Sequence, residues 1–384
     1  MQVSVKSEDN LSVLRTGFGD VRFESSAPHH GERSDFAAWA ALPIAMRRGE
    51  DLVIDGRGDQ VVAESAAKLS EIWELWMPHQ YRRVGVSFTE TSPMPKGEGR
   101  LILYSGGVDS TYNLLRHEAA GERPHLLTIH GLDYRYLDHE RFQKLLDHTS
   151  EFANRVSAGR ETLRSNIYQV YADNGVDIGS GHGFALFSSL FLFADRFAVG
   201  EISADYSQAQ DFLTFPWGTN SVTNPYFRSS TFKIETGSAD VTRASKLAVL
   251  ARDGVALKAL TLCKDSSVRP LNCGKCRKCR WTKARFLAVT GEIPDIFLNR
   301  ELDAGSFAKA KLDSAPERAF IIDLFIAARS NGTLDRFPGF EQRVEKYLRK
   351  QRHGQLSRKR TMERRIEGLV KGWLKRNGSQ GADA

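Results

Sequence analysis

The stretch Leu101-Ile102-Leu103-Tyr104-Ser105-Gly106-Gly107-Val108-Asp109-Ser110 decides the fold prediction, because it combines a short apolar strand with a glycine loop. Two adjacent glycines let the backbone turn tightly and bring amide N–H groups close to an anion. The helix predicted over residues 111–120 points the positive end of its dipole at the same place. We therefore predict that residues 105–110 hold phosphate groups. The alternative is a plain strand–helix turn rich in small residues.

Each residue of this loop has a predicted role in binding phosphate. Backbone amides from Gly106, Gly107 and Val108 onward face the phosphates, and the hydroxyls of Ser105 and Ser110 donate to phosphate oxygens. Asp109 cannot face phosphate alone, so it implies a bridging Mg²⁺. We count Ser105, Asp109 and Ser110 as candidate catalytic residues. The Gly-Lys-Ser/Thr of a Walker A loop is absent from the sequence, which disfavours a kinase or motor that acts on the γ-phosphate.

Strands and helices are predicted to alternate after residue 100. Short apolar strands are expected at 101–104, 125–130 and 166–171, with a fourth starting at 197. Helical patterns fill the intervals at 111–120, 138–158 and 184–193. This alternation is typical of a parallel, doubly wound α/β sheet with helices on both faces.

The rest of the chain is predicted to form two further regions. Residues 1–97 read as a separate N-terminal α+β extension, with β-like pieces at 21–23 and 52–54 and helices at 36–46 and 61–76. Residues 91–99 contain two prolines and two glycines and read as a linker. We therefore expect domains at 1–97, 98–300 and 301–384, the last a helical and basic C-terminal region.

All four cysteines fall in one short segment, in the pattern Cys263, nine residues, then Cys273-Gly274-Lys275-Cys276-Arg277-Lys278-Cys279. Two overlapping CxxC units and one distant cysteine can supply a tetrahedral site for Zn²⁺. Four unrelated buried thiols are a poor alternative, because the segment is too polar for a core. We favour a structural Zn²⁺ over an iron–sulfur cluster, since a closed site needs no redox role.

Together, the glycine loop and the cysteine pattern resemble the QueC-like 7-cyano-7-deazaguanine synthases over about residues 100–291. These enzymes belong to the PP-loop, or N-type ATP pyrophosphatase, superfamily. The resemblance implies a PP-loop fold, a structural zinc, and a ligase that uses ATP to adenylate the carboxylate of 7-carboxy-7-deazaguanine, releasing AMP and pyrophosphate. Ammonia then gives an amide, which a second ATP-dependent step converts to the nitrile.

The same resemblance assigns residues to the substrate pocket. Asp133-Tyr134 matches a segment after the second strand, and Asp205-Tyr206-Ser207 followed by Asp211 matches one after the fourth. Asp205 would accept hydrogen bonds from the base and Tyr206 would stack on it. Each Asp could equally be a solvated turn or helix cap. Arg243 and Lys246 align before the cysteines, where they either neutralise pyrophosphate or are exposed helix charges.

Two departures from the family pattern suggest a specialised branch. Gly181-His182-Gly183 stands where the family has Gly-Arg-Asn, and Gln208-Ala209-Gln210 replaces Gly-Tyr-Pro. Loss of a bidentate Arg is a large change. His182 could be a weaker substitute or a general base, although a lone His is more often packed. QueC-like proteins occur in anti-phage systems, where an amine of a partner protein could capture the acyl adenylate in place of ammonia.

The 384-residue composition is that of an ordinary globular protein, with 41% hydrophobic and 26% charged residues. The formal net charge is +7, yet residues 341–376 alone hold thirteen Lys/Arg against four Glu. Nucleic-acid binding through this tail, which contains Trp373, stays open but is not favoured. Neither a signal peptide nor a membrane span is evident, so we expect a cytoplasmic protein with no membrane partner, and a homodimer.

Two other functions compete with the ligase. A tRNA-thiolating enzyme would also pair a glycine loop with cysteines, but it needs a cysteine beside the ATP site that is free to carry sulfur. A non-catalytic subunit that binds ATP and docks RNA or a partner through the tail is the second. The intact Ser105–Ser110 loop favours activity, because a pseudoenzyme has no need of Asp109.

Overall fold

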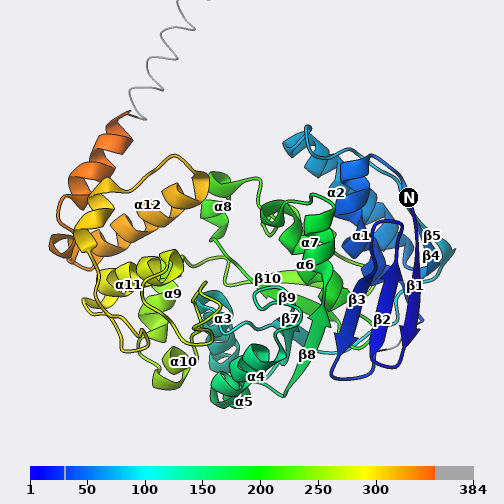
Figure 1. The fold of residues 1–384 in the computed structure, drawn as a ribbon, viewed down its shortest axis with the longest axis horizontal. Coiled ribbons are helices and arrows are strands. Elements are labelled where there is room, and N and C mark those ends of the chain that lie inside the picture. Colours follow the sequence, from blue (N-terminus) through cyan, green and yellow to red (C-terminus); the bar gives the residue numbers. More distant parts are fainter. Residues whose placement is uncertain (30–31, 351–384) are drawn as a thin grey trace, which may run out of the picture. The chain divides into compact units, whose positions relative to one another are not determined.

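The computed structural model describes residues 1–29 and 32–350, and the chain divides into two compact units, Met1–Leu302 and Asp303–Ala384. The described part of the first unit is built around a ten-stranded, mostly parallel sheet in the order β10-β9-β6-β7-β8-β3-β2-β1-β4-β5 (Figure 1). The chain is therefore an α/β protein, as the sequence predicts.

One half of the sheet is entirely parallel. It consists of β6 (Arg100–Leu103), β7 (His125–His130), β8 (Gly159–Ser165), β9 (Val199–Ser203) and β10 (Lys233–Gly237). Side chains alternate between two cores along these strands. Leu101 and Leu103 enter one core, while Ile102 and Tyr104 enter the other. Both faces of this half are therefore buried.

The N-terminal residues extend the same sheet instead of forming one of their own. β3 pairs antiparallel with β8 and so joins the halves, and β1 pairs parallel with β4. In β4 buried and exposed positions largely alternate, so only one face of this half packs on the core. The strands are β1 (Gln2–Glu8), β2 (Leu11–Arg15), β3 (Val21–Ser25), β4 (Leu52–Gly58) and β5 (Val86–Thr91).

Helices cover the two faces of the sheet (Figure 1). One core is shared with α1 (Asp35–Arg48), α2 (Gln60–Trp76), α6 (Ile167–Asp173) and α7 (Ile178–Phe191). The other is shared with α3 (Val108–Ala119), α5 (Ser150–Val156), α9 (Arg243–Leu250), α10 (Gly254–Lys258) and α11 (Arg277–Thr290). The remaining helices of this unit are α4 (His139–His148), α8 (Gln208–Thr214) and the 3₁₀ turn η1 (Asn224–Tyr226).

Two sequence-predicted elements differ in the structure. The strand predicted over residues 166–171 is wrong, because the third parallel strand ends at Ser165 and α6 follows it. Ile167, Val170 and Tyr171 are buried at helical spacing, a pattern too short to distinguish from a strand in the sequence. The long helix predicted over 138–158 is two helices, α4 and α5, that meet at Thr149.

The second unit is helical where it is described. It contains α12 (Ala315–Ser330) and the 3₁₀ segments η2 (Ala304–Lys309) and η3 (Leu334–Arg336). Ser314 caps α12, and Phe307, Phe320 and Phe340 pack within the unit. Most of the predicted basic tail, including Trp373, lies beyond residue 350 and so outside the described residues.

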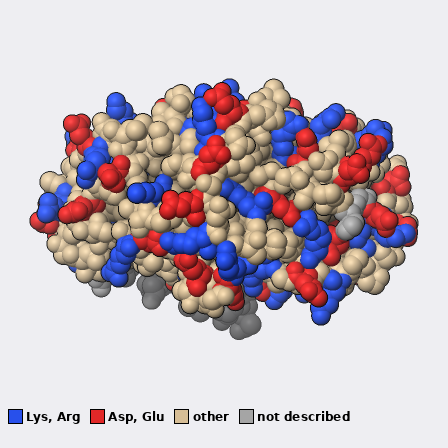
Figure 2. All heavy atoms as spheres, turned by 90° about the horizontal axis from the view of Figure 1, so that it is seen from below, with Lys and Arg blue, Asp and Glu red and all other residues tan. Residues whose placement is uncertain are grey.

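Figure 2 shows Lys and Arg side chains interspersed with Asp and Glu over the face that it presents. Acidic and basic groups thus share this surface. Among residues 1–29 and 32–350, no helix has both the length and the apolar character needed to cross a bilayer.

Candidate functional site

The five parallel strands β6–β10 end at the same edge of the sheet. The chain runs from β6 outward to β7 and β8, then returns to place β9 and β10 on the other side of β6. β6 and β9 are therefore neighbours whose connections leave in opposite directions. In open α/β sheets, such a switch point creates a crevice at the carboxyl ends of the strands, where ligands bind.

The glycine loop begins directly after β6 and leads into α3. Gly106 has φ +72°, and a Cβ there would lie 2.5 Å from the Thr261 side chain. The Gly106 carbonyl accepts a hydrogen bond from the Thr261 amide at 2.9 Å, which fixes the loop against the chain before the cysteines. Ser105 is exposed and Ser110 is buried, and their hydroxyls lie 3.4 Å apart. The predicted strand–loop–helix geometry is therefore present.

Asp109, in the first turn of α3, lies against two cations from α9. Lys246 Nζ donates to its Oδ1 at 2.9 Å, and the Arg243 guanidinium contacts both carboxylate oxygens. Burial alone would raise the pKa of Asp109, but the charges of Arg243 and Lys246 outweigh it and hold that pKa below its usual value. Lys246 is 1% exposed, so this cation is held inside the protein. The structure thus brings three predicted residues together.

Asp205 lies after β9 and is surrounded by hydrogen-bond donors. Its Oδ2 accepts from Trp217 Nε1 at 3.1 Å and from Thr219 Oγ1 at 3.2 Å, while Arg243 Nη2 lies 3.9 Å from its Oδ1. Tyr206 packs edge-on to Trp217, with ring centroids 6.0 Å apart. The same Arg243 therefore links the carboxylate of the glycine loop to the one after β9.

A small hollow, part of it open to solvent, adjoins Asp205. Asp211 of α8 lines it, and its Oδ2 accepts the Ser221 amide at 2.8 Å. Burial raises the pKa of Asp211. Ser207 and Gln210 form a capping box that starts α8, which gives the Gln208-Ala209-Gln210 departure a structural role. The hollow thus presents two carboxyl groups, Asp205 and Asp211.

His182 lies within α7, not in a loop before it. Its Nδ1 is 2.9 Å from the Ile178 carbonyl, and its Nε2 is 3.2 Å from Thr219 Oγ1 and 3.8 Å from Asp205 Oδ2. Gly183 lets the loop after α8 approach, because a Cβ there would lie 2.0 Å from the Gly218 carbonyl oxygen. The altered triplet therefore brings His182 to the Asp205 carboxylate.

Asp133 and Tyr134 follow β7 and contact the segment that contains the cysteines. The Arg269 guanidinium lies 5.1 Å from the Tyr134 ring centre and 3.4 Å from Asp133 Oδ1. Tyr134 is buried and Asp133 is exposed. Neither residue lines the hollow beside Asp205, so the described contacts separate this pair from Asp205, Tyr206 and Asp211.

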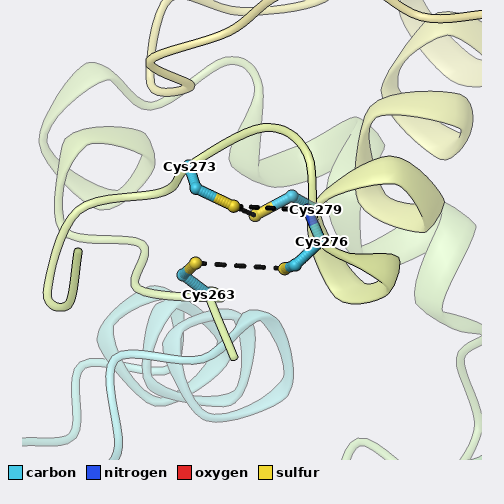
Figure 3. Close-up of side chains that lie close together, drawn as sticks. All are labelled: Cys263, Cys273, Cys276 and Cys279. Carbon is cyan, nitrogen blue, oxygen red and sulfur yellow. Dashed lines mark hydrogen bonds between the residues drawn. The ribbon is translucent and has the colours of Figure 1, made fainter. Parts of the chain in front are cut away.

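The four cysteines form one cluster, shown in Figure 3. Their sulfur atoms all lie within 4.8 Å of one another, with 3.9 Å between Cys263 and Cys276 and 4.0 Å between Cys273 and Cys279. A tetrahedral Zn–S₄ site with bonds of about 2.3 Å needs sulfur separations of about 3.8 Å. The cluster therefore has the size needed to hold a single metal ion such as zinc.

The backbone around the cluster also suits thiolate ligands. Amides of Lys275 and Cys276 each lie 3.3 Å from Cys273 Sγ. Burial opposes ionisation of Cys276, but hydrogen bonds from neighbouring groups outweigh it and lower its pKa to about 7, whereas burial raises the pKa of Cys263 and Cys279. Cys279 belongs to the first turn of α11, so a bound metal would tie this helix to the loop after α10.

Two residues of the site, Trp217 and Thr219, are not predicted from the sequence. They lie in the loop between α8 and η1, where no motif marks them. The only signal was Pro216-Trp217-Gly218, a large aromatic between two turn-forming residues. Their contact with Asp205 depends on chain folding and not on spacing.

Comparison with known proteins found no match: no protein-family model, curated protein or solved structure matches this chain. The fold and the site geometry therefore carry the functional argument.

Proposed function

We propose that this protein is an ATP-dependent carbon–nitrogen ligase. It would adenylate the carboxylate of 7-carboxy-7-deazaguanine or a close analogue, and an amine would then displace AMP. The observation that carries the proposal is the meeting of Asp109, Arg243 and Asp205 at the switch point between β6 and β9. The glycine loop, the cations Arg243 and Lys246, and the hollow beside Asp205 then adjoin one another.

The glycine loop would bind the phosphates of ATP through backbone amides between Gly106 and Ser110. Asp109 would hold Mg²⁺, which supplies shielding of the phosphate charge. Arg243 and Lys246 now neutralise Asp109. A Mg²⁺ held by that carboxylate would neutralise it, and the partly exposed Arg243 would then be placed to pair with phosphate oxygens, with the buried Lys246 adding positive charge behind it.

The hollow beside Asp205 would hold the nitrogen-rich part of the acid. The Asp205 and Asp211 carboxyls accept N–H groups, and Tyr206 offers an aromatic edge or face. A deazapurine carries N–H donors on one edge and the carboxylate on the other. Binding by the N–H edge would direct the carboxylate toward the α-phosphate, and holding the two in line supplies much of the acceleration.

The cysteine cluster would bind a structural Zn²⁺. All four ligands would be thiolates, which would leave no open position for a substrate or water. The same cluster argues against tRNA thiolation, because the chain has four cysteines and none lies outside it to carry sulfur.

The test is to incubate the purified protein with ATP, Mg²⁺ and 7-carboxy-7-deazaguanine, with and without ammonia, and to follow AMP and products by mass spectrometry. We expect AMP formation that depends on the acid. The product mass names the amine: ammonia gives an amide or nitrile, and a partner protein gives a conjugate of its amino group, as an anti-phage role would require.

The matched variants are Asp109→Asn and Asp240→Asn. Asp240 is an exposed carboxylate that pairs with Arg116 nearby and touches neither Arg243 nor Asp205. Acid-dependent AMP formation should be lost in the first and kept in the second. Absence of AMP from the unmodified protein with this acid and with other heteroaromatic acids would contradict the ligase and favour a non-catalytic ATP-binding subunit.

A further inference from the structure

A chain of three hydrogen bonds links α7 to the Asp205 carboxylate. His182 Nδ1 lies 2.9 Å from the carbonyl oxygen of Ile178, and His182 Nε2 lies 3.2 Å from Thr219 Oγ1. Thr219 Oγ1 in turn lies 3.2 Å from Asp205 Oδ2. Both ends of this chain, a carbonyl and a carboxylate, can only accept hydrogen bonds.

A count of the available protons determines the protonation state of this hydrogen-bonded chain. Each of the three hydrogen bonds requires one hydrogen. A neutral imidazole supplies one and a threonine hydroxyl supplies one, so a chain with both ends unprotonated is one hydrogen short. The missing proton must reside either on His182, as an imidazolium, or on Asp205, as a carboxylic acid.

The surroundings of Asp205 place the proton on His182. Trp217 Nε1 donates to Asp205 Oδ2 at 3.1 Å, and the Arg243 guanidinium lies 3.9 Å from Oδ1. Both groups favour a carboxylate over a neutral acid. Asp177, on the same helix, is engaged in capping it through the Ser180 amide. His182 is 9% exposed, and a buried cation needs such an anionic partner.

We infer that His182 is a buried imidazolium that fixes Asp205, through Thr219, as an anion whose second oxygen accepts an N–H group from a ligand in the hollow. Asp205 Oδ1 accepts no hydrogen bond within the described residues, whereas Oδ2 has two donors. Asp205 would touch the ligand, and His182, Thr219 and Trp217 are positioning residues. The ligand class is therefore an N–H donor such as an amine, amidine or aminopyrimidine ring.

The protonation state can be measured without nucleotide or substrate. We would label the ten histidines with ¹⁵N and record ring-nitrogen NMR spectra from pH 6 to pH 8. His182→Gln identifies the signal. We expect both His182 nitrogens to carry protons over this range, and the imidazolium to be lost in Thr219→Val and Asp205→Asn. Asp211→Asn alters the same hollow but not the hydrogen bonds of His182 and Thr219, so it should leave the His182 ring-nitrogen signal unchanged.

A neutral His182 at pH 6–8, or an imidazolium that persists in Thr219→Val, overturns the inference. The role of the ligand rests on the proposed function and has its own readout. Thr219→Val should raise the KM for the deazapurine acid at least tenfold and leave the KM for ATP unchanged, while Thr223→Val, a buried threonine nearby that does not contact Asp205, should change neither. An imidazolium in a protein that never forms AMP contradicts the ligase alone. Normal AMP formation with a neutral His182 contradicts this inference alone.

Discussion

Asp59 and Asp109 occupy equivalent places in the two halves of the sheet, yet they have different partners. Each follows a parallel strand and stands at the start of the next helix, Asp59 between β4 and α2 and Asp109 between β6 and α3. The Asp59 carboxylate accepts backbone amides of Val61, Met94 and Ser230 at 2.8–3.0 Å. Asp109 instead pairs with the side chains of Arg243 and Lys246.

The difference separates a structural carboxylate from a functional one. Backbone amides cannot leave Asp59 without unfolding the segment they belong to, so this group holds Met94 and Ser230 together. Charged side chains can leave Asp109 when a ligand offers better partners. The strand–loop–helix unit supplies the position in both cases, and the partner atoms decide between stability and chemistry.

Removing the metal should cause the largest loss of stability. We expect that loss to be confined to the half of the first unit that contains the cysteine cluster. A chelator that strips the cysteine cluster should abolish amide protection over residues 259–300 and lower the melting temperature, because structural zinc sites contribute about 10 kcal/mol or more to folding. Hydrogen exchange by mass spectrometry would show β1–β5 still protected. Lys275→Ala, an exposed change within the same loop, is the control, and purified protein without metal would contradict the prediction.

Asp109→Asn should lower the rate of acid-dependent AMP formation by about 10²–10³, because it removes a charge that organises the reacting phosphates. Steady-state kinetics on folded protein measure this change. Asp59→Asn, at the equivalent place in the other half, should leave the rate per folded molecule near that of the unmodified protein. Equal losses in both variants would show that the comparison fails.

Asp59→Ala should reduce the free energy of unfolding by about 3 kcal/mol, since it removes a helix cap and leaves several amides without an acceptor. Urea denaturation followed by circular dichroism measures this change. The exposed Glu8 is the control, and Glu8→Ala should leave the denaturation midpoint unchanged. If Asp59→Ala left the free energy of unfolding unchanged, the backbone amides would have found other acceptors, which would contradict the prediction.

The smallest effect concerns His117, at the last turn of the helix that Asp109 begins. A hydrogen bond to Glu201, and a smaller contribution from the one to Glu122, raise the pKa of His117 above its usual value despite partial burial. A raised pKa stabilises the fold below about pH 6.5, and this stabilisation is lost as the pH rises through the folded-state value. His117→Gln should therefore cost about 1 kcal/mol at pH 6 and less at pH 9, measured by denaturation at both pH values. A loss of stability in His117→Gln that is the same at both pH values would contradict this prediction.

The sequence predicted the parallel core of the fold because its signals are local. Leu101–Ser110 encodes a strand, a glycine loop and a helix start within ten residues, and the structure has all three. Cys263 and Cys273–Cys279 encode a compact cluster in the same way, and their sulfur atoms do converge. The strand predicted at 166–171 failed because a short helix and a short strand bury the same kinds of residue.

The sequence by itself determined the α/β class, the glycine loop and the cysteine cluster, because each depends on residues close together in the chain. Only the tertiary structure decided that residues 1–91 extend the same sheet, and that Asp109 meets cations more than 130 residues later. It also placed His182 and Thr219 on the Asp205 carboxylate. These contacts join distant segments through strand order and helix packing, which no local spacing records.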